Sequence, residues 1–362
     1  VITGGADIDL AIRDLVRSAF GHSGQKCSAA SLAILEAGLY DDARVLGRIA
    51  DAVRSLRVGR AIELATMMGP VVQTPSGKLA RALTELDAGE RWLVEPKQLD
   101  SSGRLWSPGV KIGVRPGSWF HLTECFGPVL GIMRARDLDD AIALQNATEF
   151  GLTGGLHTLD PDEIEHWIDR VEVGNVYVNR HTTGAIVQRQ PFGGWKHSAI
   201  GPGAKTGGPH DILRFVKLRA STLDTPLTAS ALADVDMAGL RSEQNLLRHR
   251  PLPKVVVRAG STTSEAELRV ARDAARIIGV ETEIADTRES DDVLARRIGA
   301  TGATRLRALV PISDALTRAC HAAAITVDDA PVTACSTIEL AHWTREQVVS
   351  RTLHRHGRVP GR

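Results

Sequence analysis

Apolar residues recur at intervals of three and four along several stretches of the chain, and short apolar runs separate these stretches. This spacing is typical of amphipathic helices that alternate with buried strands. The helices predicted in the first two thirds of the chain cover residues 8–20, 45–56, 78–86, 138–147 and a segment that begins at Asp160. The predicted strands are 31–35, 92–94, 110–114 and 176–178. An α/β fold follows from this alternation.

The pattern changes near residue 221 and then resumes. Residues 241–254 carry several basic side chains and two prolines, which favours a connection, and we therefore expect domains at 1–220 and 255–362 joined by a linker at 221–254. Ser264 and Glu267 have the spacing of a capping box that opens a helix ending at about 278. The other elements expected here are strands 255–257, 282–284 and 306–310 and helices 292–298 and 314–324. This alternation predicts a second α/β domain with a parallel sheet.

Composition narrows the function classes. The 362 residues are 43% hydrophobic and 24% charged, with a formal net charge of +1, so no net field favours a nucleic acid or a membrane surface as partner. No apolar run is long enough to span a membrane and no secretory signal opens the chain, so we expect a cytoplasmic protein. The four cysteines are widely separated in the sequence, so we expect neither a dense disulfide framework nor a bound metal ion held by a Cys-x-x-Cys pair. The chain starts without methionine, and we expect that an N-terminal portion is missing.

One cysteine lies on a glycine-rich turn. Cys27 follows Gly21 and Gly24 and is flanked by Lys26 and Ser28. Glycines allow a ligand to approach the backbone, and a neighbouring ammonium favours the nucleophilic thiolate. These features suit attack on a carbonyl carbon, whereas the alternative is a buried structural cysteine.

Three segments, in order along the chain, resemble motifs of the aldehyde dehydrogenase superfamily. Residues 20–29 contain its Gly-Gln-x-Cys turn, residues 124–129 contain its Glu-x-Phe-Gly-Pro segment, and residues 191–201 contain its Pro-Phe-Gly-Gly-x-Lys-x-Ser segment, with Ala199 where glycine is usual. The resemblance implies that Cys27 is the catalytic nucleophile. It also implies that Glu124 binds the nicotinamide ribose of NAD and that Phe126 packs beside the nicotinamide ring. Taken alone, Glu124 would more often be an ordinary exposed residue before a Gly-Pro turn; the other motifs reverse this preference.

Residues 179–192 and 201–209 are similar to the subfamily that oxidises L-glutamate γ-semialdehyde, the open form of 1-pyrroline-5-carboxylate. The similarity implies that Ser28, Gly184 and Ala185 hold the α-carboxylate of the substrate, and that Phe20 and Phe192 line its aliphatic stem. Backbone donors at a glycine turn form a reasonable anion site, although a plain turn is the alternative for Gly184 and Ala185.

The C-terminal region resembles the extension of the longer proline utilization A proteins, on residues 325–332 and 340–347. This implies an aldehyde dehydrogenase catalytic domain followed by a Rossmann-like α/β domain, with FAD as a second cofactor only if a proline dehydrogenase domain is fused upstream. No G-x-G-x-x-G occurs. In the superfamily, the cofactor domain, the oxyanion asparagine and the glutamate base precede the first of the three motifs.

The sequence therefore predicts NAD-dependent oxidation of L-glutamate γ-semialdehyde in proline catabolism, within a longer chain that supplies the missing portion and forms a homo-oligomer. The isolated chain is expected to be inactive. Two alternatives are a non-catalytic structural or partner-binding fragment and a cysteine acyltransferase or hydrolase. No Cys-His-Asn signature supports the hydrolase, for which a ribose-binding Glu124 would have no use.

Overall fold

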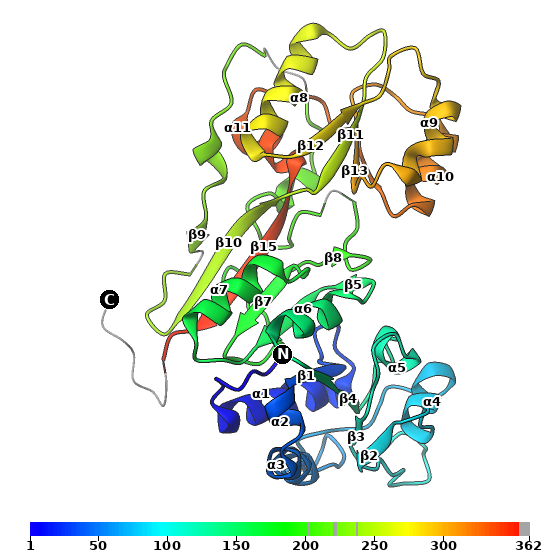
Figure 1. Ribbon diagram of the computed structural model, residues 1–362, viewed down its shortest axis with the longest axis vertical. Coiled ribbons are helices and arrows are strands. Elements are labelled where there is room, and N and C mark those ends of the chain that lie inside the picture. Colours follow the sequence, from blue (N-terminus) through cyan, green and yellow to red (C-terminus); the bar gives the residue numbers. More distant parts are fainter. Residues whose placement is uncertain (202, 220–222, 237, 355–362) are drawn as a thin grey trace. The chain divides into compact units, whose positions relative to one another are not determined.

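The computed structural model describes residues 1–201, 203–219, 223–236 and 238–354, and the chain divides into two units (Figure 1). Unit 1 comprises Val1–Ala185, Leu240–Gln244 and Val349–Arg362, and unit 2 comprises Ile186–Gly239 and Asn245–Val348. Strands β10 (Glu243–Pro251) and β15 (Thr344–Thr352) belong partly to each unit. Among the described residues, no helix is both long enough and apolar enough to cross a membrane.

Unit 1 is built on a four-stranded sheet with the order β1-β4-β3-β2. Strands β1 (Leu32–Glu36), β3 (Gly109–Ile112) and β4 (Val129–Ala135) are parallel, and β2 (Arg91–Val94) runs antiparallel to β3. Ile2 forms parallel bridges with Leu35 and His157, so residues at the start of the chain lie between β1 and the parallel pair β6 (Thr153–Leu156) and β7 (Asn175–Val178).

The longer helices of unit 1 begin within two residues of their predicted starts. Asp7 caps α1 (Ile8–Phe20), Asp42 caps α3 (Ala43–Arg54) and Asp160 caps α7 (Pro161–Arg170) by accepting hydrogen bonds from backbone amides of the first turn. Apolar faces of α1 and α3 pack on β1 and β4 in one buried core. The remaining elements are α2 (Ala37–Tyr40), α4 (Gly77–Thr84), α5 (Trp119–Leu122), α6 (Leu138–Asn146), β5 (Phe150–Gly151) and the 3-10 turn η1 (Gly21–Gly24).

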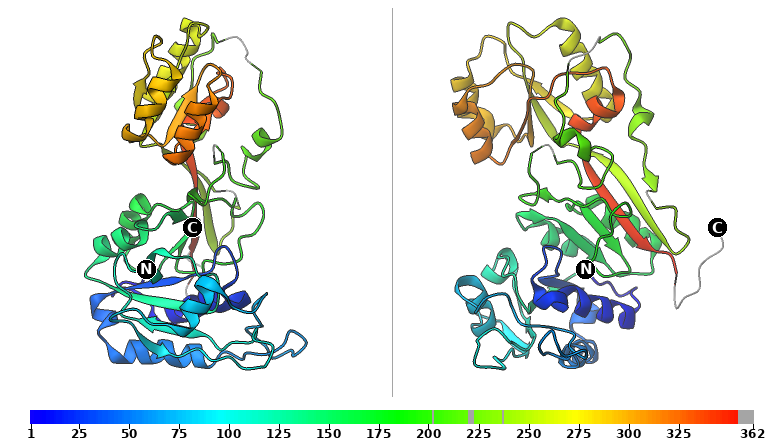
Figure 2. Two further views of the ribbon diagram at one scale, coloured as in Figure 1. Left: turned by 90° about the vertical axis from the view of Figure 1, so that its right-hand side faces the viewer. Right: turned by 180° about the vertical axis from the view of Figure 1, so that it is seen from behind.

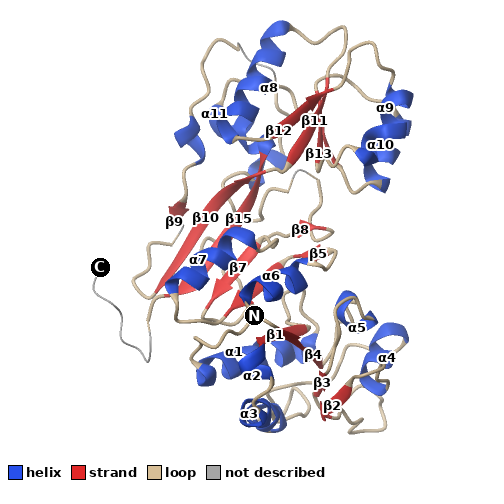
Figure 3. Cartoon of the chain, viewed as in Figure 1, coloured by secondary structure: helices blue, strands red, loops and turns tan. Residues whose placement is uncertain are grey.

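Unit 2 contains the second parallel sheet, with the order β12-β11-β13-β14. Alternate residues of β11 face opposite layers. Val255 and Val257 pack with α8, and Val256 packs with α9 and α10. Figures 2 and 3 show α8 on one side of these strands and α9 and α10 on the other. The predicted capping box of Ser264 and Glu267 is present at the start of α8. The Rossmann-like layering expected for this region is therefore confirmed.

The elements of this sheet and its helices are β11 (Lys254–Arg258), α8 (Glu265–Ile278), β12 (Glu281–Ile284), α9 (Asp291–Arg297), β13 (Arg305–Ala308), α10 (Asp314–Ala322) and β14 (Thr326–Asp328). The others are β8 (Trp195–Lys196), β9 (Val235–Asp236), α11 (Ser336–Glu339) and the 3-10 turns η2 (Asp211–Arg214), η3 (Ala229–Leu232), η4 (Ile298–Ala300) and η5 (Leu340–Trp343).

The segment expected to be a linker has more structure than its composition indicates. Residues 221, 222 and 237 lie outside the described residues, and the rest of 221–254 includes η3, β9 and all of β10. Asn245 and Leu247 are fully buried, because alternate side chains of β10 point into the protein, although basic residues follow them on the strand. The domain boundaries at 220 and 255 stay a prediction.

Candidate active site

Cys27 lies just beyond the end of α1, on a turn with an unusual backbone. The helix ends at Phe20, which is buried, and His22 and Ser23 then adopt positive φ angles of 53° and 57°. The Ser23 hydroxyl donates a hydrogen bond of 2.5 Å to the carbonyl of Gly69, which holds this turn in place. The Cys27 thiol is consequently exposed, whereas Ser28 beside it is buried.

The cysteine turn packs against the segment that contains Glu124 and Phe126. Gly24 has a φ of +68°, and a Cβ atom there would lie 2.2 Å from the carbonyl oxygen of Gly127, so the contact requires glycine. The side-chain amide of Gln25 donates to the Phe126 carbonyl at 3.2 Å and accepts from the Val72 amide at 2.8 Å. Two motifs about one hundred residues apart in sequence are thereby adjacent.

Glu124 and Phe126 are both exposed in this arrangement. The Glu124 carboxylate forms neither an ion pair nor a hydrogen bond within the described part of the chain. Phe126 has a φ of +59°, a conformation that a bulky residue rarely adopts and that is often retained at functional sites. An available carboxylate beside an exposed ring suits a ribose hydroxyl pair attached to a flat aromatic group.

Gly184 and Ala185 belong to the same unit as Cys27, on a loop held beside Ser28. The Thr182 hydroxyl donates to the Ser28 carbonyl at 2.9 Å, and the Thr182 amide donates to the Ser18 hydroxyl at 3.0 Å. Gly184 has a φ of +82°, and both Gly184 and Ala185 are exposed. The Ser28 hydroxyl makes no hydrogen bond within the described residues, so it is available as a donor.

Sequence reasoning missed two residues that shape this region, Thr182 and Tyr177. Tyr177 is 1% exposed, and its hydroxyl has no hydrogen-bond partner among the described residues. Burial raises the pKa of the Tyr177 hydroxyl to about 12. The positive charge of Arg180 lowers this pKa, and Cys27 raises it slightly. A lone tyrosine on a predicted strand carries no sequence signal for such a position.

The remaining cysteines have different environments. Cys125 and Cys320 are buried, and burial raises the pKa of each thiol to about 11. Cys335 is exposed, like Cys27. Cys125 and Cys320 are therefore core residues.

The two phenylalanines predicted to line the substrate belong to different units. Phe20 lines a cavity of about 780 Å³ in unit 1, formed largely by α1 and α3. Phe192 belongs to unit 2, where its backbone pairs with Thr206 across the glycine-rich loop, and its role stays a prediction. In the same loop Gly194 has no room for a side chain, since a Cβ atom would lie 2.4 Å from Cβ of Ser198. Pro202 of this motif region lies outside the described residues.

Comparison with known protein families identifies the family of this chain. The profile of the Aldehyde dehydrogenase family matches residues 1–220, more than half of the chain. The chain belongs to the aldehyde dehydrogenase family.

Several relatives of this chain are named 1-pyrroline-5-carboxylate dehydrogenase. The chain is 40% identical over 217 residues to the one from Geobacillus thermodenitrificans, and the match covers 59% of this chain and 41% of that protein. A solved 1-pyrroline-5-carboxylate dehydrogenase from Thermus with bound NAD is 38% identical, with a TM-score of 0.52 over 57% of this chain and 39% of the other.

The second part of the chain is also matched. The structure of proline utilization A from Corynebacterium freiburgense covers 99% of this chain and 39% of its own, with 43% identity and a TM-score of 0.85. The resemblance to proline utilization A proteins seen in the sequence is thus confirmed. The chain spans about two fifths of the length of the relatives it matches.

Proposed function

We propose that this chain supplies the thiol part of the active site of an NAD-dependent L-glutamate γ-semialdehyde dehydrogenase. One observation carries the proposal. The turn before Cys27 packs on the Glu124–Phe126 segment through Gly24 and Gln25, and the residue after Cys27 binds the Gly184 loop through Thr182. A nucleophile, a dinucleotide-binding segment and a carboxylate-binding loop are in this way connected by direct contacts.

The exposed Glu124 and Phe126 fit NAD. The carboxylate of Glu124 can accept hydrogen bonds from two vicinal ribose hydroxyls, and the ring of Phe126 can pack against the nicotinamide. NAD+, when bound, accepts a hydride from the substrate carbon. The relative from Thermus with bound NAD supports this choice of cofactor. FAD would be required only if a proline dehydrogenase domain were fused to this chain.

Cys27 would carry the covalent chemistry. Its thiolate attacks the aldehyde carbon and forms a thiohemiacetal, whose oxygen accepts a hydrogen bond from the Cys27 backbone amide. Loss of hydride from that carbon leaves a thioester, and attack of water then releases the carboxylate product and regenerates the thiol. The resemblance assigns activation of this water to a glutamate, and the second oxyanion donor to an asparagine, neither of which we match to a residue of this sequence.

Recognition of the substrate would depend on its α-carboxylate. The Ser28 hydroxyl and the backbone amides of Gly184 and Ala185 can donate to this group, and positive φ at Gly184 turns the loop amides to one side. Phe20 and Phe192 would line the three-carbon stem. Discrimination then rests on donors that an aldehyde without a carboxylate leaves unused.

The names of the relatives, proline utilization A among them, support a role for this reaction in proline catabolism. We also propose that the protein is a cytoplasmic homo-oligomer.

Replacement of Cys27 by alanine tests the proposal. In the native polypeptide that contains this chain, Cys27→Ala should abolish NADH formation from L-glutamate γ-semialdehyde while leaving the circular dichroism spectrum unchanged. Cys335→Ala, at the other exposed cysteine, is the matched control and should retain activity. Activity of Cys27→Ala within about tenfold of wild type would contradict the assignment, because loss of a covalent nucleophile costs far more. An inactive wild-type polypeptide would instead favour a structural or partner-binding role.

A further inference from the structure

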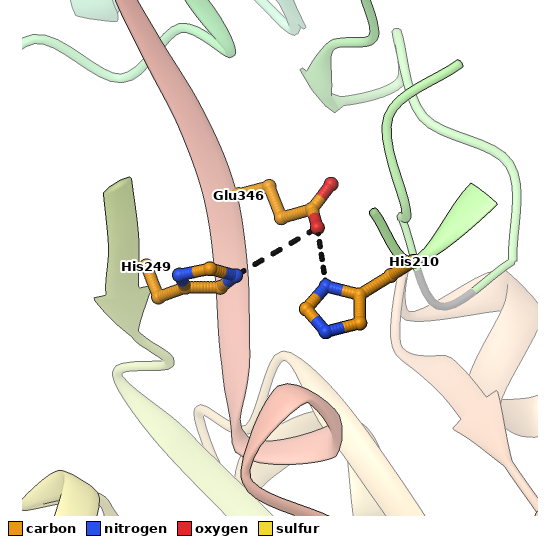
Figure 4. A group of neighbouring side chains, drawn as sticks. All are labelled: His210, His249 and Glu346. Atoms are coloured by element: carbon orange, nitrogen blue, oxygen red, sulfur yellow. Dashed lines mark hydrogen bonds and ion pairs between the residues drawn. The ribbon is translucent and has the colours of Figure 1, made fainter. Parts of the chain in front are cut away.

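Two imidazoles and one carboxylate converge in unit 2, outside the residues of the candidate active site. His210 follows the glycine-rich loop, His249 lies on β10 and Glu346 lies on β15 (Figure 4). Nδ1 of His210 is 2.7 Å from Oε1 of Glu346, and Nε2 of His249 is 3.7 Å from the same oxygen. One ligand atom from each residue lies within 4.8 Å of the others.

His249 is the unusual member of the cluster. Its side chain is only 6% exposed, and both ring nitrogens are buried without a hydrogen-bond partner among the described residues. A separation of 3.7 Å from Glu346 is too long for a hydrogen bond. Buried polar atoms in folded proteins almost always have a partner, so the ring points to a ligand that is not part of the chain.

We propose that His210, His249 and Glu346 form a binding site for a divalent transition-metal ion, with Zn²⁺ as the preferred ion. Two imidazole nitrogens and one carboxylate oxygen are a ligand set that zinc binds and that Ca²⁺ or Mg²⁺, which prefer oxygen ligands, do not. Zinc bonds of about 2.0–2.2 Å place tetrahedral ligand atoms roughly 3.4 Å apart. The distances from Glu346 to His210 and His249, 2.7 and 3.7 Å, lie on either side of this value, and no pair of ligand atoms is more than 4.8 Å apart. Side-chain movements of about 1 Å would bring the three atoms to this spacing.

The surroundings favour this occupant. The second oxygen of Glu346 accepts a hydrogen bond of 2.7 Å from the Lys205 amide, which orients the carboxylate as outer-shell partners of metal sites do. The Lys205 ammonium itself donates to the Gly193 carbonyl within the glycine-rich loop.

A cavity lies beside two of the three side chains. His210 and Glu346 line a cavity of about 190 Å³ in unit 2, together with the Asp328–His342 pair. A water molecule in this cavity could bind an ion held by the three side chains, which is the usual completion of a three-residue zinc site.

An ion at this position would stabilise the glycine-rich loop. His210 lies at the end of that loop, and the loop is already attached to β15 by a hydrogen bond of 2.8 Å from the Trp195 indole to the Glu346 carbonyl. Because the ion would bind only the folded form, it would raise the thermal stability of the chain with the logarithm of one plus the ratio of its concentration to its dissociation constant.

Calorimetric titration of the metal-free 362-residue chain with ZnCl₂ tests the proposal. One equivalent should bind at pH 7.5, and affinity should fall as pH decreases below 6, since the imidazoles must be neutral to bind metal. His249→Asn should weaken binding at least a hundredfold, and Glu346→Gln should do the same. His321→Ala, which changes an exposed histidine of the same unit, is the matched control and should bind like wild type.

X-ray absorption of the zinc-loaded wild-type chain gives a readout that does not depend on the variants folding. Two imidazole ligands with oxygen and without sulfur would support the site, while sulfur ligation would assign the zinc to cysteine. Absence of stoichiometric binding, or full retention of binding in a folded His249→Asn chain, would overturn the proposal.

Discussion

At the scale of single residues, the position of the Ser28 hydroxyl leads us to predict which substrates the enzyme prefers. Replacing Ser28 by alanine removes one hydroxyl donor to a charged acceptor, a loss of about 1.5–3 kcal/mol or roughly ten- to hundredfold in kcat/KM. We expect this loss with L-glutamate γ-semialdehyde, and we expect propanal, which has no carboxylate, to be oxidised as before. Steady-state kinetics of the native polypeptide that contains this chain, with both aldehydes, measure the difference. Equal losses would show that Ser28 positions the thiol and does not bind the carboxylate.

Gly24 is a second residue with a specific requirement. Gly24→Ala would combine a positive φ of 68° with a Cβ atom 2.2 Å from the Gly127 carbonyl oxygen. We expect a loss of about 3 kcal/mol or more in the free energy of unfolding, from backbone strain and overpacking together. Gly117→Ala is the matched control, since its φ is +74° but the space around it is open, and it should cost only about 1 kcal/mol. Urea unfolding of the two variants compares these costs, and equal values would mean that the Gly24–Gly127 contact relaxes freely.

At the scale of elements, the start of α8 is stabilised by its own sequence. The Ser264 hydroxyl accepts from the Glu267 amide at 3.2 Å, and the Glu267 carboxylate accepts from the Ser264 amide at 2.8 Å. Ser264→Ala should lower the free energy of unfolding by about 1 kcal/mol, because one helical amide loses its acceptor. Ser264→Asp keeps an acceptor and should restore most of the loss. Denaturant midpoints of the two variants distinguish capping from a general effect of substitution.

At the scale of the whole molecule, buried carboxylates make unit 2 sensitive to acid. Burial alone would raise the pKa of Glu346, but the neighbouring His210 and His249 and the Lys205 amide outweigh it and lower the pKa to about 2. Burial would also raise the pKa of Asp328. The neighbouring His342 and Arg307 outweigh this effect and hold the pKa of Asp328 well below its ordinary value. Carboxylates with lowered pKa stabilise the fold above their ordinary pKa, and this contribution is lost as pH falls through the folded-state value.

The stability of unit 2 should therefore decrease between about pH 5 and pH 2 in the metal-free chain. Hydrogen exchange of the β11 and β13 amides as a function of pH measures this loss. Glu346→Gln should be less stable than wild type at pH 7 and should show a flatter pH dependence. Glu281→Gln, at an exposed glutamate, should follow the wild-type curve, and a steep acid transition in Glu346→Gln as well would assign the sensitivity to other groups.

The sequence itself determined most of the regular elements and the identity of the motif residues. Helices α1, α3, α7 and α8 were predictable because apolar residues at helical spacing and capping side chains act within a few positions of one another. The cysteine turn, the Glu124 segment and the glycine-rich loop were recognisable for the same reason, since each motif is local in sequence. The central strand β4 and the long strands β10 and β15 were not predicted, because their places depend on partners far away in the chain.

Only the tertiary structure decided which residues meet. Gln25 binds the Phe126 carbonyl, Thr182 binds the Ser28 carbonyl, and His249 faces Glu346, over separations of 101, 154 and 97 positions. Such contacts leave no periodic signal, since a hydrogen bond or a ligand set depends on distances in space. For this reason the nucleophile could be named from the sequence, while its connection to the dinucleotide-binding segment, and the cluster of two histidines and a glutamate, emerged only from the fold.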